Sequence, residues 1–144
     1  MKLSREIEID RPIDEVFTFV ADARNDVSWC PKVRSVSLVS GVGGESKYAV
    51  VHKPVPWLPS REMQMNCVWF DEPHRIEWRE EDGTDVFRVT YELEDLGTGR
   101  TRFRQRSDAE LGAAGWLHPI YKAGIGRDIA RQLRKLKKLL EKAD

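Results

Sequence analysis

Hydrophobic and polar positions alternate along most of this chain, and the period changes to that of a helix only near its two ends. Residues 2–10 place Leu3, Ile7 and Ile9 on one side and mostly charged residues on the other, which is the pattern of a half-buried strand. A period of two dominates again in six later segments, residues 33–40, 45–52, 61–70, 75–81, 87–93 and 102–109. Most of these segments are joined by short turns, such as the glycine-rich residues 41–44, so we expect neighbouring strands to pair as antiparallel hairpins.

Helical spacing occurs on either side of this strand-rich region. Apolar residues spaced three and four apart predict a short helix over residues 13–22, and residues 25–31 are expected to form a second short helix or turn with Trp29 buried. The C-terminal stretch, residues 115–141, carries an apolar stripe made of Ile125, Ile129, Leu133, Leu136 and Leu140. No other helix of similar length is predicted, so this helix must bury its stripe against the sheet.

The order of these elements predicts an α+β fold. We expect a curved seven-stranded antiparallel sheet wrapped around the long C-terminal helix, with two short helices between the first and second strands. The 144 residues fit one domain, residues 1–144, which is large enough to bury a substantial core.

Charge and cysteine content narrow the choice of partners and compartment. The 24 Lys and Arg residues balance the 24 Asp and Glu residues, so we expect no nucleic-acid partner. Cys30 and Cys67 are far apart in the sequence and are expected to be buried free thiols in a reducing compartment. The sequence has neither a signal-peptide core nor an apolar run of membrane length, so we expect a cytoplasmic protein, a monomer or homodimer, without stable membrane insertion.

Several sequence signatures of chemistry are missing. The histidines, cysteines and acidic residues do not have the spacing of a metal site, and the glycine-rich turn lacks the lysine of a phosphate-binding loop. We therefore expect no metal and no cofactor. Arg102, Arg104 and Arg106 form a basic stripe, for which ion pairs with Glu92 and Glu94 on the neighbouring strand are a simpler explanation than nucleic-acid binding.

Particular segments resemble a known family. They are residues 9–17 (Ile-Asp-Arg-Pro-Ile-Asp-Glu-Val-Phe), Asp22, residues 29–31 (Trp-Cys-Pro), the turn at residues 41–43 and the helical segment 128–136. Together they resemble the helix-grip superfamily, which includes START domains, the major birch-pollen allergen and the bacterial polyketide cyclase/dehydrase-like proteins (SRPBCC). The resemblance covers essentially the whole chain and implies a cavity between the sheet and the long helix. The same fold hosts carriers, cyclases and interaction proteins, so it leaves the function open.

Successive residues of a strand point to opposite faces of the sheet, and this alternation, which we call strand parity, indicates which side chains would line such a cavity. If the face with Phe87, Val89 and Tyr91 is turned toward the helix, the rest of the wall consists of Met63, Met65, Cys67, Trp69, Ile76, Trp78, Phe103, Gln105 and Ser107. This apolar and aromatic composition is typical of a small-molecule pocket, and a filled core is the alternative. We expect Tyr91, Gln105 and Ser107 to orient a ligand, unless backbone groups satisfy them.

The resemblance also suggests an entrance to the cavity. In this fold, loops and the start of the long helix frame the opening, so Trp57, Trp116, His118 and Tyr121 are candidates for a gate. His52 borders the proline-rich residues 53–60. A histidine at the entrance could act as an acid or base near neutral pH, and an incidental surface histidine is the alternative. His74 follows a turn proline and is expected to be exposed.

Three classes of function remain. The first is a binding protein that holds a small hydrophobic or aromatic molecule, such as a lipid, polyketide or isoprenoid, by shape selection and desolvation. The second is a polyketide aromatase/cyclase, for which the sequence offers no convincing inward-facing arginine or acid–base pair, so enzymatic activity is not the expectation. The third is a toxin-like or partner-binding protein, which only the basic surfaces support.

Overall fold

The computed structural model describes residues 2–53, 59–110 and 118–142, and the side chains of residues 118–122 are not among the features described. Its elements follow the predicted order, with short 3-10 turns (η) added. They are β1 (Lys2–Ile9), α1 (Ile13–Val20), η1 (Ala23–Asn25), α2 (Asp26–Trp29), β2 (Val33–Ser40), η2 (Gly43–Glu45), β3 (Lys47–His52), β4 (Arg61–Asp71), β5 (Arg75–Glu81), β6 (Val86–Gly97), β7 (Arg100–Glu110) and α3 (His118–Lys142).

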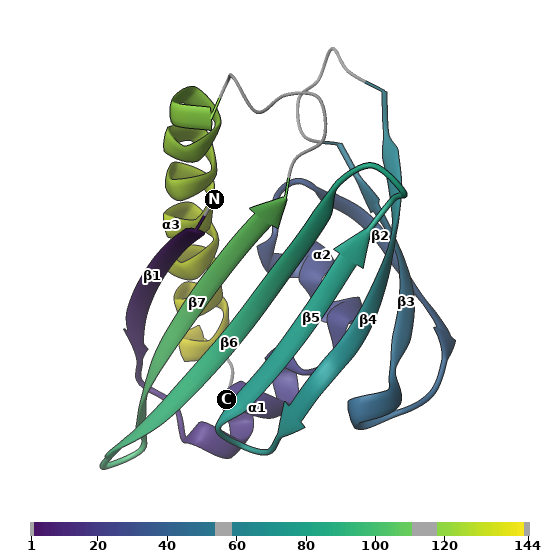
Figure 1. Ribbon diagram of the computed structural model, residues 1–144. Helices are drawn as coiled ribbons and strands as arrows, with labels where there is room; N and C mark the ends of the chain where they lie inside the picture. Colours follow the sequence, from purple (N-terminus) through teal and green to yellow (C-terminus); the bar gives the residue numbers. More distant parts are fainter. Residues whose placement is uncertain (1, 54–58, 111–117, 143–144) are drawn as a thin grey trace.

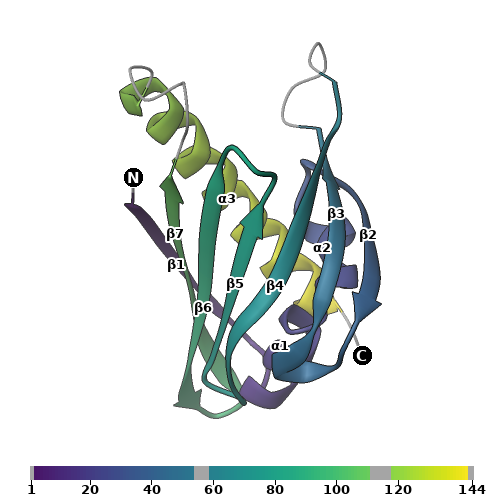
Figure 2. The same ribbon diagram turned by 45° about the vertical axis from the view of Figure 1, so that its right-hand side comes forward.

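The strands form one antiparallel sheet, and the predicted fold class is confirmed. The seven strands are ordered β1-β7-β6-β5-β4-β3-β2, so β1 and β2 are the two edges. All three helices lie on the same side of this sheet (Figures 1 and 2), with α3 running obliquely across it. We call the face toward the helices the inner face.

The apolar stripe of α3 is buried as its spacing predicts. Ile129, Leu133, Leu136 and Leu140 are each at most 8% exposed, whereas Ile125 is half-buried. Burying a side chain of this size contributes about 1.5–3 kcal/mol, so this stripe is a major source of the attachment between helix and sheet.

Polar contacts attach the C-terminal end of α3 to the end of β1 and to the residues that follow it. Arg11 Nε donates to the carbonyl oxygen of Leu140 over 2.8 Å, and the backbone N–H of Asp10 donates to Glu141 over 2.8 Å. Lys137 Nζ also donates to the carbonyl oxygen of Glu8. Carbonyl groups in the last turn of a helix have no partner within the helix, so Arg11 satisfies an acceptor that would otherwise need water.

The outer face of the sheet carries the expected ion pairs. Arg102 lies 3.0 Å from Glu94 and Arg106 lies 2.7 Å from Glu92, which confirms the cross-strand interpretation of the basic stripe. Arg104 instead pairs with Glu6 of β1, at 2.9 Å. Pairs at this degree of exposure contribute little to stability, but they leave the stripe electrically balanced. Among the described residues, no helix is long and apolar enough to cross a membrane.

Candidate functional site

The inner face has a closed part and a more open part. Around the helices the predicted wall is packed: Met63, Met65, Cys67, Ile76, Trp78, Tyr91, Phe103 and Gln105 are all at most 8% exposed. Phe87, Val89 and Ser107 also belong to the inner face by register, but they are only half-buried. Val89 is paired on both sides, with Trp78 and Ser107, so neighbouring strands protect its backbone. We call Phe87, Val89 and Ser107 the open region of the inner face.

The inward orientation that parity predicts for Trp69 is wrong. The pairing of β4 with β5 shifts between Cys67 and Trp69, where one extra residue forms a β-bulge. A single inserted residue reverses which side chains point inward, so Trp69 reaches the outer face and is 51% exposed. There its ring stacks beneath the guanidinium of Arg75, whose carbon lies 5.1 Å from the ring centroid.

Trp29 attaches the short helix α2 to the inner face. Its ring centroid lies 5.7 Å from that of Tyr91 and 6.2 Å from that of Phe103, and the Tyr91 and Phe103 rings are 5.1 Å apart. Tyr48 and Trp78 form a second edge-on pair at 5.8 Å. Trp29 is completely buried, which confirms it as the anchor of this segment. The cluster therefore packs α2 onto the inner face of the sheet.

Two of the three predicted orienting groups are neighbours on β7. Gln105 Nε2 donates to Ser107 Oγ over 3.5 Å, a long hydrogen bond. The other amide atom, Gln105 Oε1, is buried and has no hydrogen-bond partner among the described residues. Tyr91 pairs with Gln105 across the strands. Burial raises the pKa of the Tyr91 hydroxyl well above its usual value, and the nearby Asp26, Cys30 and Glu80 raise it further, so this hydroxyl stays protonated.

Sequence reasoning missed Asp26 in α2. Its side chain is buried, and burial raises the pKa of its carboxyl well above the usual value, with further increases from Glu80 and Asp22. The indole of Trp29 lowers the pKa of Asp26 and so opposes this rise. Neither the Trp29 N–H nor Asp26 Oδ1, however, makes a hydrogen bond of normal geometry within the described residues. The spacing of three residues between Asp26 and Trp29 was the available signal, because it puts both on one side of a helix.

A second missed feature is the pair of His52 and Glu80. His52 Nε2 lies 2.8 Å from Glu80 Oε2, and both side chains are largely buried, at 23% and 13% exposed. His52 ends β3 and Glu80 lies near the end of β5, so the pair spans β4 next to Phe87. Glu80 alternates with the inward-facing Ile76 and Trp78, but a charged residue near a strand end offered no reason to expect a partner.

The proposed gate falls largely outside the described residues. Trp57 and Trp116 are not among them, while His118 and Tyr121 belong to the first turns of α3 without a description of their side chains. His74 is exposed, as its position after a turn proline predicts. Within the described parts of the chain, no group of three or more His, Cys, Asp or Glu side chains could hold a metal ion.

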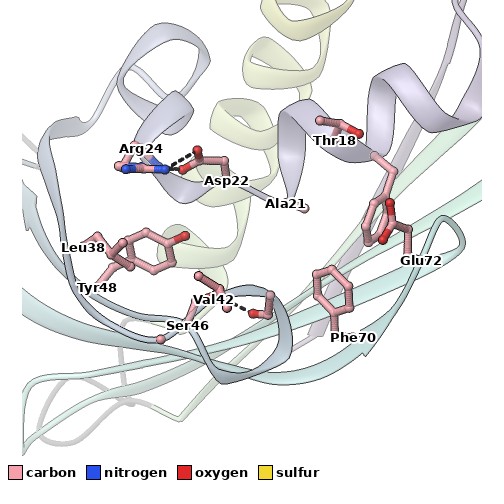
Figure 3. Close-up of a pocket in the computed structure, with 13 residues that line it drawn as sticks. Thr18, Ala21, Asp22, Arg24, Leu38, Val42, Ser46, Tyr48, Phe70 and Glu72 are labelled. Carbon is pink, nitrogen blue, oxygen red and sulfur yellow. Dashed lines mark hydrogen bonds and ion pairs between the residues drawn. The ribbon is translucent and has the colours of Figure 1, made fainter.

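Two hollows lie away from the predicted wall. One, of about 310 Å³, separates α1 from the β2–β3 hairpin (Figure 3) and contains the Asp22–Arg24 ion pair; its other walls include Phe17, Leu38, Val42, Tyr48 and Phe70. The other, of about 300 Å³, lies among outer-face residues that include Arg75, Glu92 and Arg104. Neither hollow is lined by a residue of the predicted wall.

Comparison with known proteins matches a family model to nearly the whole chain. The model of the family described as "Polyketide cyclase / dehydrase and lipid transport" matches residues 1–141. No curated protein matches the chain.

Solved structures resemble this one closely at low sequence identity. TTHA0849 from Thermus thermophilus has a TM-score of 0.81 at 18% identity, over 96% of this chain and 95% of that one. The Zhui aromatase/cyclase from Streptomyces sp. R1128 has a TM-score of 0.81 at 13% identity, over 98% and 93%. A START superfamily protein from Mycobacterium smegmatis has a TM-score of 0.73 at 14% identity, over 97% and 94%. At these identities the likeness establishes the shared fold.

Proposed function

Because the chain belongs to the polyketide cyclase/dehydrase and lipid transport family, we propose that it binds a small hydrophobic or aromatic molecule between the sheet and α3, as a carrier or sensor. The observation that carries this proposal is the half-buried open region of Phe87, Val89 and Ser107, next to the packed part of the inner face. A ligand there would cover apolar surface and meet the buried polar groups beside it.

The driving force would come from removing apolar surface from water. An aromatic molecule that buries about 200 Å² of such surface gains about 5 kcal/mol, from which the loss of its free motion is subtracted. Affinity in the micromolar range therefore requires either a larger ligand or added hydrogen bonds. The packed Trp29, Tyr91 and Phe103 rings form a rigid wall, which keeps the cost of ordering low.

Native mass spectrometry of the freshly purified protein, followed by solvent extraction, tests this proposal. We expect a discrete extra mass that extraction removes. In Val89→Trp a large ring fills the open region and should abolish the extra mass, whereas Arg88→Trp puts the same ring on the outer face and should retain it. An unliganded mass, together with no thermal shift for methylnaphthalene or long-chain alcohols, would contradict the proposal.

An aromatase/cyclase activity is the second candidate, and the buried acid on the same face favours it. In an aldol closure, a base removes a proton beside one ketone while an acid protonates the oxygen of the ketone under attack. Burial raises the pKa of the Asp26 carboxyl, which suits a proton donor, and the imidazole of His52 beside Glu80 is the candidate base. If the protein has this activity, Asp26→Asn should abolish conversion of a poly-β-ketone mimic, whereas its binding should weaken by no more than the loss of one hydrogen bond, about tenfold. If wild-type protein binds the mimic without converting it, the enzyme hypothesis is wrong.

The third class, a protein that works through its basic surface, loses support. Each arginine of the stripe on β7 has a glutamate partner within 3.0 Å. A surface balanced in this way attracts acidic partners weakly.

A further inference from the structure

Four buried polar atoms on the inner side of the sheet have no hydrogen-bond partner among the described residues. They are Asp26 Oδ1, Trp29 Nε1, Trp78 Nε1 and Gln105 Oε1. Their four residues are each at most 5% exposed. A buried polar atom without a partner costs about 1–3 kcal/mol. The Trp29 indole acts on the Asp26 carboxyl, so these two groups partly satisfy each other, whereas Trp78 Nε1 and Gln105 Oε1 have no such interaction among the described residues and call for a further partner. We call these four residues the polar pole.

Register and ring packing bring the polar pole together next to the open region. Gln105 and Tyr91 are opposite each other, and Trp29 packs on Tyr91 from α2. Trp78 is opposite Val89, and Val89 is opposite Ser107, so one row of the sheet joins the pole to the open region. Gln105 Nε2 is already directed toward Ser107 Oγ.

The chemistry of the pole is that of a neutral hydrogen-bonding site. Two indole N–H groups can only donate, the Gln105 oxygen can only accept, and a protonated Asp26 carboxyl can do either. No buried side chain in the described part of the chain is a lysine or arginine. Arg61, which shares the inner face by parity, is bound to Asp82 and Asp85, and His52 is bound to Glu80. Arg5, opposite Gln105, is exposed, and its guanidinium lies against Gly126 of α3.

We propose that the polar pole of Asp26, Trp29, Trp78 and Gln105 binds the hydroxyl or carbonyl group of an uncharged ligand, whose apolar part occupies the open region. This inference rests on the proposed function and narrows it to neutral oxygenated molecules. A carboxylate ligand is disfavoured because its charge would be buried near Glu80, and no buried lysine or arginine among the described residues could balance it.

Four naphthalene probes of one shape test this inference on the wild-type protein. Naphthol and acetylnaphthalene offer a hydroxyl and a carbonyl, methylnaphthalene offers neither, and naphthoate carries a charge. By isothermal titration we expect naphthol and acetylnaphthalene to bind about fivefold to tenfold more tightly than methylnaphthalene, the gain from one or two hydrogen bonds. Naphthoate should bind most weakly.

Variants locate the contact. Gln105→Met removes the amide at nearly constant length and should reduce the preference for acetylnaphthalene over methylnaphthalene by about fivefold, without weakening methylnaphthalene. Arg104→Gln, on the adjacent outward position, is the matched control and should leave all affinities unchanged. In nitrogen–proton correlation spectra, naphthol should shift the indole N–H signals of Trp29 and Trp78 and leave that of the outer-face Trp69 in place.

The outcomes separate the two proposals. Equal affinity for naphthol and methylnaphthalene, with unshifted Trp29 and Trp78 signals, would mean that water alone satisfies the pole, and it would overturn this inference while the proposed function stands. Tightest binding of naphthoate would overturn the inference in the same way. If none of the probes binds and extraction yields nothing, both proposals are wrong. The probe comparison needs no variant, so it remains decisive even if Gln105→Met does not fold.

Discussion

Replacing Asp26 by asparagine should change how the stability of the ligand-free protein depends on pH. Burial raises the pKa of this carboxyl in the folded state, so above the ordinary aspartate pKa of 3.8 the folded protein holds a proton that the unfolded chain has released. Folding must then take up one proton, and the free energy of unfolding falls as pH rises. The asparagine side chain has nearly the same shape and no proton to take up.

The size of the effect follows from this single proton. Each pH unit between 3.8 and the folded-state pKa removes about 1.4 kcal/mol of stability from the wild type and none from Asp26→Asn through this site. The variant should therefore gain on the wild type steadily as pH rises. Near pH 4 the two should differ only by the constant effect of exchanging carboxyl for amide.

Urea unfolding followed by near-ultraviolet circular dichroism, at several pH values between about 4 and 8, measures this difference. The informative quantity is the difference between the two proteins at each pH, because all other titrating groups are shared. A difference that stays flat over this range would refute the reasoning, since Asp26 would then ionise as freely in the folded protein as in the unfolded chain.

Three further substitutions test other parts of the structure. Asp82 accepts hydrogen bonds from the backbone N–H groups of Asp85 and Thr84, which together with Arg61 lower its pKa to about 2. Its contribution to the free energy of unfolding, about 1 kcal/mol after solvent screening, should therefore be present above pH 3.8 and lost toward pH 2. The stability that Asp82→Asn loses relative to wild type should vanish in acid, and a loss that persists at pH 2 would contradict this. Gly41→Ala should cost more than about 2 kcal/mol in thermal unfolding, because its φ of 79° is strained for alanine and the added carbon would overlap the Glu45 carbonyl. Gly83→Ala has a φ of 90° but open space around the added carbon, so it should cost about 1 kcal/mol. Equal costs would refute the overlap at Gly41. Leu136→Ala should cost about 2–5 kcal/mol in urea unfolding because Leu136 is completely buried on the apolar stripe of α3. Leu139→Ala, at an exposed position of the same helix, should cost less than about 1 kcal/mol. Similar losses would mean that α3 faces the sheet differently.

Part of the site could be predicted because strand parity is a local property. Tyr91, Phe103 and Gln105 lie on the inner face, as the alternation of polar and apolar residues requires. Their roles toward a ligand stay predictions. Parity failed for Trp69 because residues 67–70 are four consecutive apolar residues, so no polar position fixed the register where the bulge occurs.

The element order, the buried stripe of α3 and the ion pairs beside Arg102 and Arg106 were all predictable from the sequence. Each of these follows from periodicity or from residues brought together by adjacent strands, which the chain encodes over short distances. Three features became visible only in the folded structure: Asp26 of α2 is buried near Glu80, His52 contacts Glu80 across β4, and four buried polar atoms lack hydrogen bonds of normal geometry among the described residues. Those contacts depend on how α2 and distant strands pack. Local sequence patterns do not contain that information, because burial and electrostatic coupling arise only when the helices pack against the sheet.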